Sequence, residues 1–548
     1  SRGRGRRTEH PPDHGMESAD GSIEAPLLGA GATLTQAHVQ EPGVVTHSSA
    51  TAASPPRYES LPRIIQPAQE PQEPTSSSGW VAHAVSKAER LRCLDALRGV
   101  AITIMVFVNA GGAPQLNTGH TAWDSNDAPL LHLADYACPF FVYCIGAAMA
   151  VAFVPQRGST RPARSRTTAT KHALRRFLLM GCIGLFIKNG TIRAFGQIVD
   201  LSVLRLPSVL GRLGGAYLIV AMVLIWVPAG GPKVLGGWAS ATLPEVAQHG
   251  WRHLAILGIT LLYLVLTFLV PAPGCPAGYL GPGGTDCGPH SPWARHVRCG
   301  HCNHTTTEGC PLLHCTAGFM GHFDKMLLGT RHLANQGRHG SMCAEKYSCI
   351  EFDDNGPFGV LPSTFHVFLG FTACRALIES ATPLLKVKRL LGYSVLYAAA
   401  GLLLDLLGLI PISKNMWSLS FCLWTSGVAS ALLCLLYLLI DHPTVRVTKG
   451  GIIRMLGQNS LGLYVISELV DDTLESFCIG GRDYKHCTDD NTFRGAVSKV
   501  LRDIARHVSH GGEHELDQNE TVLYALANVL LIMLFAWWFD YRGIIIKL

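Results

Sequence analysis

Apolar segments long enough to cross a lipid bilayer recur along most of this chain. A membrane-spanning helix needs about 20 mostly apolar residues. The clearest segments of this kind cover residues 256–270, 396–410, 419–440 and 522–538. Ten segments qualify in all, at about 96–112, 133–154, 173–189, 209–228, 253–272, 358–378, 389–411, 416–440, 453–474 and 522–540. The sequence therefore predicts an all-α fold, a polytopic membrane helix bundle of about ten spans.

The composition excludes several other classes of protein. Charged residues make up 15% of the 548 residues and hydrophobic residues 48%, whereas a soluble domain carries about 25% charge. So little charge leaves too little polar surface for several soluble domains, and the apolar fraction is too high for disorder throughout. The 57 glycines show no three-residue period, which excludes collagen. The net charge of +6 is small for this length, so we expect no nucleic-acid partner.

Residues 1–85 differ in composition from the rest of the chain. They are rich in Pro, Ser, Gly, His, Glu and Arg and contain few apolar runs, so they cannot bury enough surface to offset their chain entropy. We expect a disordered cytosolic tail at 1–85 and a membrane domain at 88–548. Because the chain begins without Met and without a signal-peptide pattern, we also expect its start to be truncated.

Lysines and arginines give the expected orientation of the spans, because short cytosolic loops carry an excess of both. With ten alternating spans, the basic segments fall on one side of the membrane, at 87–98, 157–176, 386–389, 446–454 and 542–547. That side is expected to be the cytosol, and both ends of the chain lie on it. The cluster at 161–176 has a second interpretation, contact with the phosphates of a nucleotide cofactor or an anionic lipid.

The opposite face carries a loop at about 273–356 that contains eight cysteines, and Cys478 and Cys487 lie in the other large loop there. An even set of cysteines on one face indicates disulfides in an oxidising lumen or outside the cell. Sequons for glycosylation at Asn303 and Asn519 lie on the same face. We therefore expect a luminal, disulfide-rich loop whose pairing the sequence leaves open.

Within that loop, residues 299–304 read CGHCNH, which has plausible ligand spacing for zinc. The luminal setting and the surrounding cysteines favour disulfides over zinc. We therefore expect no metal site.

Polar side chains inside or beside an apolar span are costly and are often functional. Asn109 ends the first span just before Gly111 and Gly112. Its amide lies beside a backbone that a ligand can approach closely, although a simple helix cap fits the pattern equally well. His120 follows in the next luminal loop, where an imidazole can act as a general base or an acyl carrier. The alternative is an ordinary loop histidine, one of 24 in the chain.

Two further groups of polar residues lie in later spans. One begins the eighth span and includes Asn415, Trp417 and Ser418. An N-cap would explain an Asn or Ser at that place. The other lies inside the ninth span, the weakest of the ten, at Gln458, Asn459, Ser460 and Glu468. Hydrogen bonds between helices are the simpler interpretation of this group.

The order of the motifs resembles the transmembrane heparan-α-glucosaminide N-acetyltransferase family. The motifs are RLRCLDALRG at 90–99, VFVNAGG at 106–112, HTAW at 120–123, LADYACPFF at 133–141, PSVLGRLG at 207–214, PAPGCPAGYLGPGG at 271–284, HFDKMLLG at 322–329, FDDNGPFGVLPS at 352–363, NMWSLS at 415–420 and QNS at 458–460. They follow one another in the family's order over about 88–470, which chance does not explain.

The resemblance implies an acyltransferase of the lysosomal or another endomembrane. Such an enzyme takes acetyl-CoA from the cytosol and acetylates the terminal glucosamine of heparan sulfate, or of a related amino sugar, in the lumen. Its active histidine corresponds to His120. Its pore asparagine corresponds to Asn109, which would donate a hydrogen bond to the thioester oxygen. Direct transfer and an acetyl-histidine intermediate both stay open.

Further site residues and partners follow from the same resemblance. We expect Arg175 and Arg176 to contact the phosphates of acetyl-CoA, and we add Arg212, although the span count places it nearer the luminal end. Acceptor-binding residues are expected at Trp123, Asp124, Asn415, Trp417 and Glu468. The expected partners are membrane lipid, acetyl-CoA and an amino-sugar polysaccharide, and a homodimer is left open.

The chain departs from the family in features that bear on the acceptor. The cysteine-rich insertion at about 285–349 is larger than the family's, and Ser467 precedes Glu468 where the animal enzymes have a histidine. The alternative function from another class is a transporter for a small solute, which would share only the bundle. The sequence shows no clear internal repeat, no broken helix pair and few acidic residues within the spans, so the acetyltransferase is the better reading.

Overall fold

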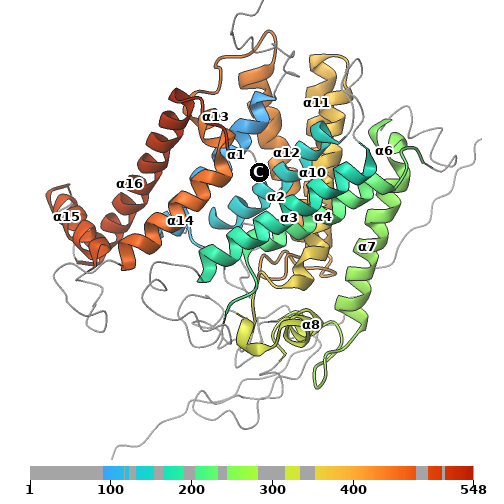
Figure 1. Cartoon of the computed structure of the whole chain (residues 1–548), viewed down its shortest axis with the longest axis horizontal. Coiled ribbons are helices and arrows are strands. Elements are labelled where there is room, and N and C mark those ends of the chain that lie inside the picture. The colour runs from blue at the N-terminus through green and yellow to red at the C-terminus, as the bar shows by residue number, and fades with distance from the viewer. Residues whose placement is uncertain are drawn as a thin grey trace, which may run out of the picture. The chain divides into compact units, whose positions relative to one another are not determined.

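The computed structural model describes residues 91–116, 118–121, 131–153, 165–189, 204–231, 244–281, 315–333, 352–476, 492–508 and 513–546 (Figure 1). The chain divides into two units, 1–83 and 84–548, and every described residue belongs to the second. These residues fold into helices joined by turns and irregular segments, with no β-sheet among them. The tail predicted at 1–85 lies outside the described residues and stays a prediction.

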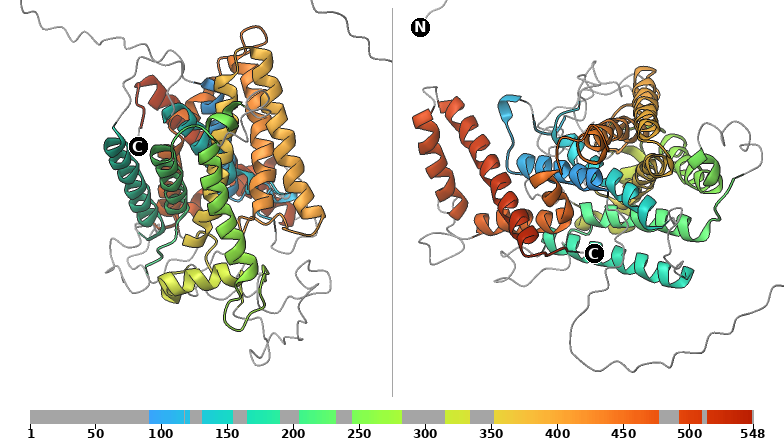
Figure 2. Two further views of the ribbon diagram at one scale, coloured as in Figure 1. Left: turned by 90° about the vertical axis from the view of Figure 1, so that its right-hand side faces the viewer. Right: turned by 90° about the horizontal axis from the view of Figure 1, so that it is seen from above.

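Ten long helices run back and forth between two ends of this unit (Figures 1 and 2). They are α1 (Arg92–Asn109), α2 (Ala134–Ala152), α3 (Arg166–Asn189), α4 (Val209–Trp226), α7 (Gly250–Leu269), α10 (Val360–Glu379), α11 (Pro383–Leu406), α12 (Leu419–Leu436), α14 (Ser460–Ser476) and α16 (Glu513–Tyr541). The shorter helices are α6 (Pro244–Gln248), α8 (Gly318–Leu328), α13 (Gly451–Gln458) and α15 (Phe493–Val508), and one-turn segments include η1 (Pro114–Leu116), η7 (Pro357–Gly359) and η8 (Tyr437–Asp441).

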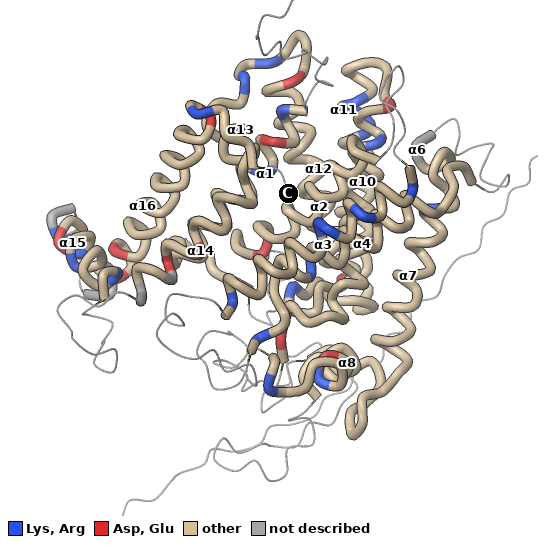
Figure 3. The backbone as a smooth tube through the Cα atoms, viewed as in Figure 1, with Lys and Arg blue, Asp and Glu red and all other residues tan. Residues whose placement is uncertain are grey.

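Different segments of the chain lie at the two ends of the bundle. At one end, helix α7 stops and helix α8 follows, and we call this the disulfide end (Figure 1). Helix α11 begins at the other, where Lys386, Lys388 and Arg389 lie in its first turns and further basic residues precede α13 (Figure 3). We call this the basic end. The names carry no assignment to a side of a membrane.

Seven helices among the described residues are long and apolar enough to cross a membrane: those that include α2, α4, α7, α10, α11, α12 and α16. The predicted all-α membrane bundle is thus confirmed. The spans predicted at 96–112 and 173–189 correspond to α1 and α3, which do not reach this apolarity. Charge is the reason, because α1 begins with Arg92, Asp95 and Arg98, and α3 carries five lysines and arginines.

The core of the bundle is a close contact between α2 and α10. A Cβ atom on Gly146 of α2 would lie 1.7 Å from the Val367 carbonyl oxygen, and one on Gly370 of α10 would lie 2.2 Å from the Tyr143 carbonyl oxygen. Only glycine permits two backbones to approach so closely. Around this contact the buried side chains of α1, α2, α4, α10 and α12 form one continuous apolar cluster.

The ninth predicted span is a broken helix. Helix α13 ends at Gln458 and α14 begins at Ser460, with Asn459 between them. The Asn459 amide donates to the carbonyl oxygen of Ile544 (3.0 Å) and accepts from the Ile546 N–H (2.9 Å). Asn459 therefore fastens the end of the chain to the bundle, which gives the break a structural role. The expectation that no helix is broken was wrong here. The spacing of polar residues in the sequence does not show that the Asn459 side chain bonds to the segment after α16, where the helix is interrupted.

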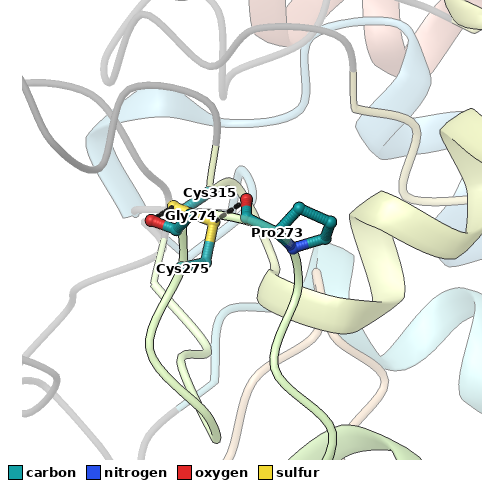
Figure 4. The surroundings of a disulfide bond; sticks show 4 residues. All are labelled: Pro273, Gly274, Cys275 and Cys315. Carbon is teal, nitrogen blue, oxygen red and sulfur yellow. Dashed lines mark hydrogen bonds between the residues drawn. A yellow bond between two sulfur atoms is a disulfide. The ribbon is translucent and has the colours of Figure 1, made fainter.

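A disulfide joins Cys275, just after α7, to Cys315, just before α8 (Figure 4). It ties the end of a spanning helix to the loop that follows, as the prediction of disulfides on this face requires. The remaining cysteines of the predicted 273–356 loop, the CGHCNH stretch, Cys478, Cys487 and Asn303 all lie outside the described residues. Helices α8 and α15 were not predicted, because each is too short or too polar to qualify as a span.

Candidate active site

His120 lies in the loop that follows α1, at the disulfide end. Its Nδ1 is 2.8 Å from Oδ1 of Asp135, which lies in the first turn of α2. The other carboxylate oxygen of Asp135 accepts from the Thr121 backbone N–H (3.0 Å) and from the Thr121 hydroxyl (2.5 Å). Asp135 is fully buried, whereas about a third of the His120 side chain is exposed. A buried carboxylate thus holds a partly exposed imidazole.

The contact with Asp135 favours one protonation state of the imidazole. A carboxylate offers only acceptors, and Oδ1 of Asp135 has no donor other than His120 among the described residues. Leaving that buried oxygen unpaired would be costly, so the Asp135 contact favours a proton on Nδ1. Nε2 of His120 then carries the lone pair and can accept a proton from, or attack, a bound molecule.

Lys414 belongs to a tight turn between α11 and α12 and reaches the same histidine. Its Nζ lies 3.0 Å from Nδ1 of His120. An ammonium group only donates, so this contact competes with Asp135 for the same ring nitrogen and favours the opposite tautomer. The turn is closed by the Trp417 N–H, which donates to the Lys414 carbonyl oxygen (3.0 Å), and Trp417 has a φ of +49°. A bulky residue with positive φ is strained. Ser418 then caps α12 by accepting from the Phe421 N–H (3.3 Å), which confirms the simple N-cap interpretation for this serine.

Arg212 is the buried cation of the site. It lies in the first turn of α4 with 6% of its surface exposed. Its Nε donates to the Ser363 hydroxyl (2.9 Å) and its Nη1 to the Asp354 carbonyl oxygen (2.7 Å). The guanidinium also lies over the Trp417 ring, 4.1 Å from the ring centre. Helices α4 and α10 and the turn before α12 therefore converge on one arginine.

The loop before η7 adds two carboxylates. Asp353 receives two hydrogen bonds from Arg205, at 2.8 and 2.9 Å. Burial raises the pKa of Asp354, but the positive charges of Lys414, Arg205 and Arg212 lower that pKa by more. The net result is a pKa below the ordinary value. Asp354 is therefore an ionised carboxylate in the same electrostatic neighbourhood as His120.

Asn109 and Glu468, both predicted site residues, form a second polar group at this end. The Asn109 amide donates to the Glu468 carboxylate (3.0 Å), and Lys188 Nζ lies 3.6 Å from the other Glu468 oxygen. The structure thus brings α1, α14 and α3 together through these side chains. Asn109 is the last residue of α1 and Ala110 is its C-cap. Its side chain bonds to a different helix, α14, which agrees with the simpler interpretation of Glu468 as a partner in a hydrogen bond between helices.

The other predicted residues have different surroundings. Arg175 and Arg176 are exposed on α3, and the Arg176 guanidinium lies over the Tyr217 ring of α4 at 4.9 Å. No described contact joins them to Arg212. Asn415 is half-buried in the same turn as Lys414. Trp123 and Asp124 lie outside the described residues.

Sequence reasoning assigned no role to Asp135 or Lys414. Asp135 stood inside a quoted motif, and a carboxylate beside an apolar span is itself a signal of function. Lys414 is 294 positions from His120 in the chain, and only the return of α11 to the disulfide end brings the two together. No pattern in the sequence could have shown that contact.

Comparisons with known proteins agree with the resemblance found in the sequence. The model of the family described as heparan-alpha-glucosaminide N-acetyltransferase, catalytic, matches residues 90–228, which include Asn109, His120, Asp135 and Arg212. The heparan-alpha-glucosaminide N-acetyltransferase of Mus musculus is 31% identical over 398 residues, covering 71% of this chain and 54% of the mouse protein. That of Homo sapiens is 30% identical over 430 residues, covering 76% and 57%. The chain spans about half the length of these relatives.

Proposed function

We propose that this chain, as a relative of the heparan-α-glucosaminide N-acetyltransferases, transfers an acetyl group across a membrane. The donor is cytosolic acetyl-CoA, and the acceptor is the amine of a terminal glucosamine in heparan sulfate or in a related luminal amino sugar. The observation that supports the proposal most directly is the His120–Asp135 pair at the disulfide end of a membrane bundle, because the tautomer that Asp135 favours leaves Nε2 able to act as a base. We assign that end to the lumen, because disulfides form in oxidising compartments.

The reaction needs a base because an ammonium group has no lone pair with which to attack. The neutral amine nitrogen forms a bond to the thioester carbon, and the carbonyl electrons move onto the oxygen. The tetrahedral intermediate collapses as the carbon–sulfur bond breaks. His120 Nε2 takes the amine proton and passes it to the departing thiolate of CoA. In the alternative route the same Nε2 first accepts the acetyl group.

The remaining predicted residues take supporting roles in this proposal. Arg175 and Arg176 are exposed about two and a half turns from the basic-end start of α3, where they can contact the phosphates of the donor. Asn109 donates one amide hydrogen to Glu468, and its second is available to a substrate oxygen. Trp123, Asp124 and Asn415 remain our proposed acceptor contacts.

The test is acetyl transfer by the purified protein in lipid vesicles. Radiolabelled acetyl-CoA is supplied with a panel of amino sugars, including glucosamine, galactosamine and an oligosaccharide that ends in glucosamine. We expect transfer to glucosamine, and we expect His120→Ala to abolish it. His332→Ala is the matched control, because His332 lies at the same end and its side chain bonds only to the Leu204 carbonyl oxygen (2.7 Å) in the described structure.

Two outcomes would contradict the proposal. Absence of acetyl transfer to every sugar would favour the transporter, and full activity of His120→Ala would remove the proposed base. A labelling experiment without sugar separates the two chemical routes, since label retained on the wild-type protein and absent from His120→Ala indicates an acetyl-histidine.

A further inference from the structure

Three buried polar side chains meet beside the His120 site with unused hydrogen-bonding atoms. They are Arg212 of α4, His366 of α10 and Trp417 of the turn before α12, with 6%, 0% and 3% of their surfaces exposed. Nη2 of Arg212, Nε1 of Trp417 and both ring nitrogens of His366 have no hydrogen-bond partner within the described structure. The ring centres of His366 and Trp417 are 5.9 Å apart.

Other contacts hold Arg212 and Trp417 in place. Arg212 uses Nε on Ser363, Nη1 on the Asp354 carbonyl oxygen and its face on the Trp417 ring. The Trp417 backbone is kept in a strained conformation by the turn that Lys414 begins. The unused atoms are therefore fixed in place, since neither side chain can turn away to find another partner without losing these contacts.

Buried polar atoms without partners are rare, because leaving water costs them their hydrogen bonds. A group of them from three different elements indicates a place prepared for a ligand. Nη2 and Nε1 can only donate, so the ligand atom is an acceptor. The guanidinium adds a positive charge at short range, which favours an oxygen on which negative charge develops.

The position of these donors fits the proposed reaction. Arg212 lies in the first turn of α4 and His366 in the second turn of α10, one layer inside the disulfide end. The turn 414–417 connects the two groups, since Lys414 contacts His120 and Trp417 contacts Arg212. A thioester that arrives from the basic end would reach these donors with its carbonyl oxygen while its carbon faces the acceptor amine.

We propose that Arg212 and Trp417 donate hydrogen bonds to the thioester carbonyl oxygen of the acetyl donor, with His366 as a third polar neighbour. This inference rests on the proposed function and replaces Asn109 in the role that the family resemblance suggested. As the nitrogen–carbon bond forms, the carbonyl electron pair moves onto this oxygen and is stabilised by both donors. The pair returns when the carbon–sulfur bond breaks, so no further reactant is required.

Trp417→Phe is the decisive variant, because it removes the indole N–H and keeps an aromatic ring beneath the guanidinium. Losing one donor to a developing oxyanion lowers kcat by roughly 10²-fold in comparable sites, and we expect a loss of this order with little change in KM for acetyl-CoA. Since the N–H is unpartnered in the folded protein, we expect the melting temperature to stay the same or rise.

Trp424→Phe is the matched control. Its indole N–H donates to the Tyr136 hydroxyl (3.0 Å), so this variant loses a satisfied hydrogen bond in the same helix bundle. We expect a lower melting temperature and near wild-type kcat. A purely structural role for Trp417 predicts that both variants behave alike, with the loss of activity following the loss of stability.

A spectroscopic measurement tests the same contact without turnover. A ketone isostere of acetyl-CoA, with a methylene group in place of sulfur and ¹³C at the carbonyl, cannot transfer its acetyl group. Hydrogen bonds to the carbonyl oxygen move its ¹³C resonance downfield. We expect this shift in wild-type protein and in Asn109→Ala, and its reduction in Trp417→Phe and Arg212→Gln.

The outcomes separate this inference from the proposed function. Acetyl transfer by the wild type together with unchanged kcat and ¹³C shift in Trp417→Phe would overturn the inference and leave the function standing. Loss of the shift in Asn109→Ala alone would return the role to Asn109. Absence of acetyl transfer by the wild type would overturn both. Should Arg212→Gln fail to fold, Trp417→Phe still decides.

Discussion

At the scale of single residues, the proposed mechanism depends on Asp135, whose carboxylate lies 2.8 Å from Nδ1 of His120. The Asp135→Asn variant would offer an N–H or a weaker acceptor to Nδ1, so the imidazole would no longer keep its free electron pair on Nε2. We expect kcat to fall on the order of 10⁴-fold with little change in KM, by analogy with other acid–histidine pairs. Steady-state acetyl-transfer kinetics measure the effect.

The control for this variant is Asp405→Asn. Asp405 lies in the last turn of α11, and its carboxylate accepts from the Ile412 N–H (2.8 Å) and makes no described hydrogen bond to His120. We expect nearly wild-type kcat. Equal losses in the two variants would show that Asp135 serves only the fold.

Asp324 of α8 gives the fold a dependence on pH. Burial, assisted by nearby Asp353, raises its pKa from 3.8 to about 7, against the hydrogen bond from the Phe358 N–H and the charge of Arg212. The folded protein therefore keeps this proton where the unfolded chain has lost it. Stability from this group is full below pH 4 and is lost as pH rises towards 7, by about 2 kcal/mol between pH 5 and 8.

The measurement is the melting temperature at pH 5 and pH 8. Asp324→Asn is neutral at both values and keeps an acceptor for the Phe358 N–H, so we expect its melting temperature to change less between them. Asp503→Asn, which alters an exposed carboxylate on α15, should leave the wild-type dependence intact. An unchanged dependence in Asp324→Asn would refute the assignment.

The sequence allowed part of the site to be predicted at this scale. His120 and Asn109 were predicted as candidates because a histidine and an asparagine stand out beside apolar spans and match a family motif. The Arg212–Trp417 stack could not be predicted, since it depends on where α4 and the turn before α12 meet. Arg212 was expected to contact phosphates, and its burial beside an indole is a different environment.

At the scale of elements, the contact between α2 and α10 depends on two glycines. Gly146→Ala and Gly370→Ala would place a methyl group within 2.2 Å of a carbonyl oxygen on the facing helix. We expect each to destabilise the protein by several kcal/mol or to prevent folding, because packed backbones cannot yield locally. Thermal unfolding and yield of folded protein measure the effect.

Glycines without neighbours provide the comparison. Nothing lies within 4 Å of a Cβ atom built on Gly181 of α3 or Gly392 of α11. Alanine at either place should be neutral or slightly stabilising, since glycine is the poorer helix former by about 1 kcal/mol. Equal damage from all four variants would contradict the assignment of the loss to the α2–α10 contact.

Most spans were predictable because about 20 apolar residues must be helical in a bilayer. The boundaries of α11 and α16 were less so. Helix α11 begins at Pro383, six residues before the predicted start, because Thr382 caps it. The prediction missed this first part, since it searched for apolar residues and the first turns of α11 are basic. Helix α16 begins at Glu513, since its polar first turns pair with α15 through Arg502 and Glu520.

At the scale of the whole molecule, the proposal requires the two ends of the bundle to face different compartments. An Asn-Gly-Thr glycosylation acceptor inserted after Leu333, at the disulfide end, should be glycosylated in microsomes. The same insertion after Val447, at the basic end, should stay unmodified. Glycosylation of the second insertion, or of both, would contradict the assignment. The readout is the change in mobility on glycan removal, compared with that of the protein without an insertion.

The close approach of α2 and α10 also limits how such a protein can move. Two backbones in direct contact have no layer of side chains on which to slide, and parting them would expose carbonyl groups to hydrocarbon. We therefore expect the α2–α10 pair to move as one rigid unit. A rearrangement that opens the centre of the bundle first to one compartment and then to the other must therefore take place in the neighbouring helices. These are α1 and α13 on one side of the α2–α10 pair and α4 and α7 on the other.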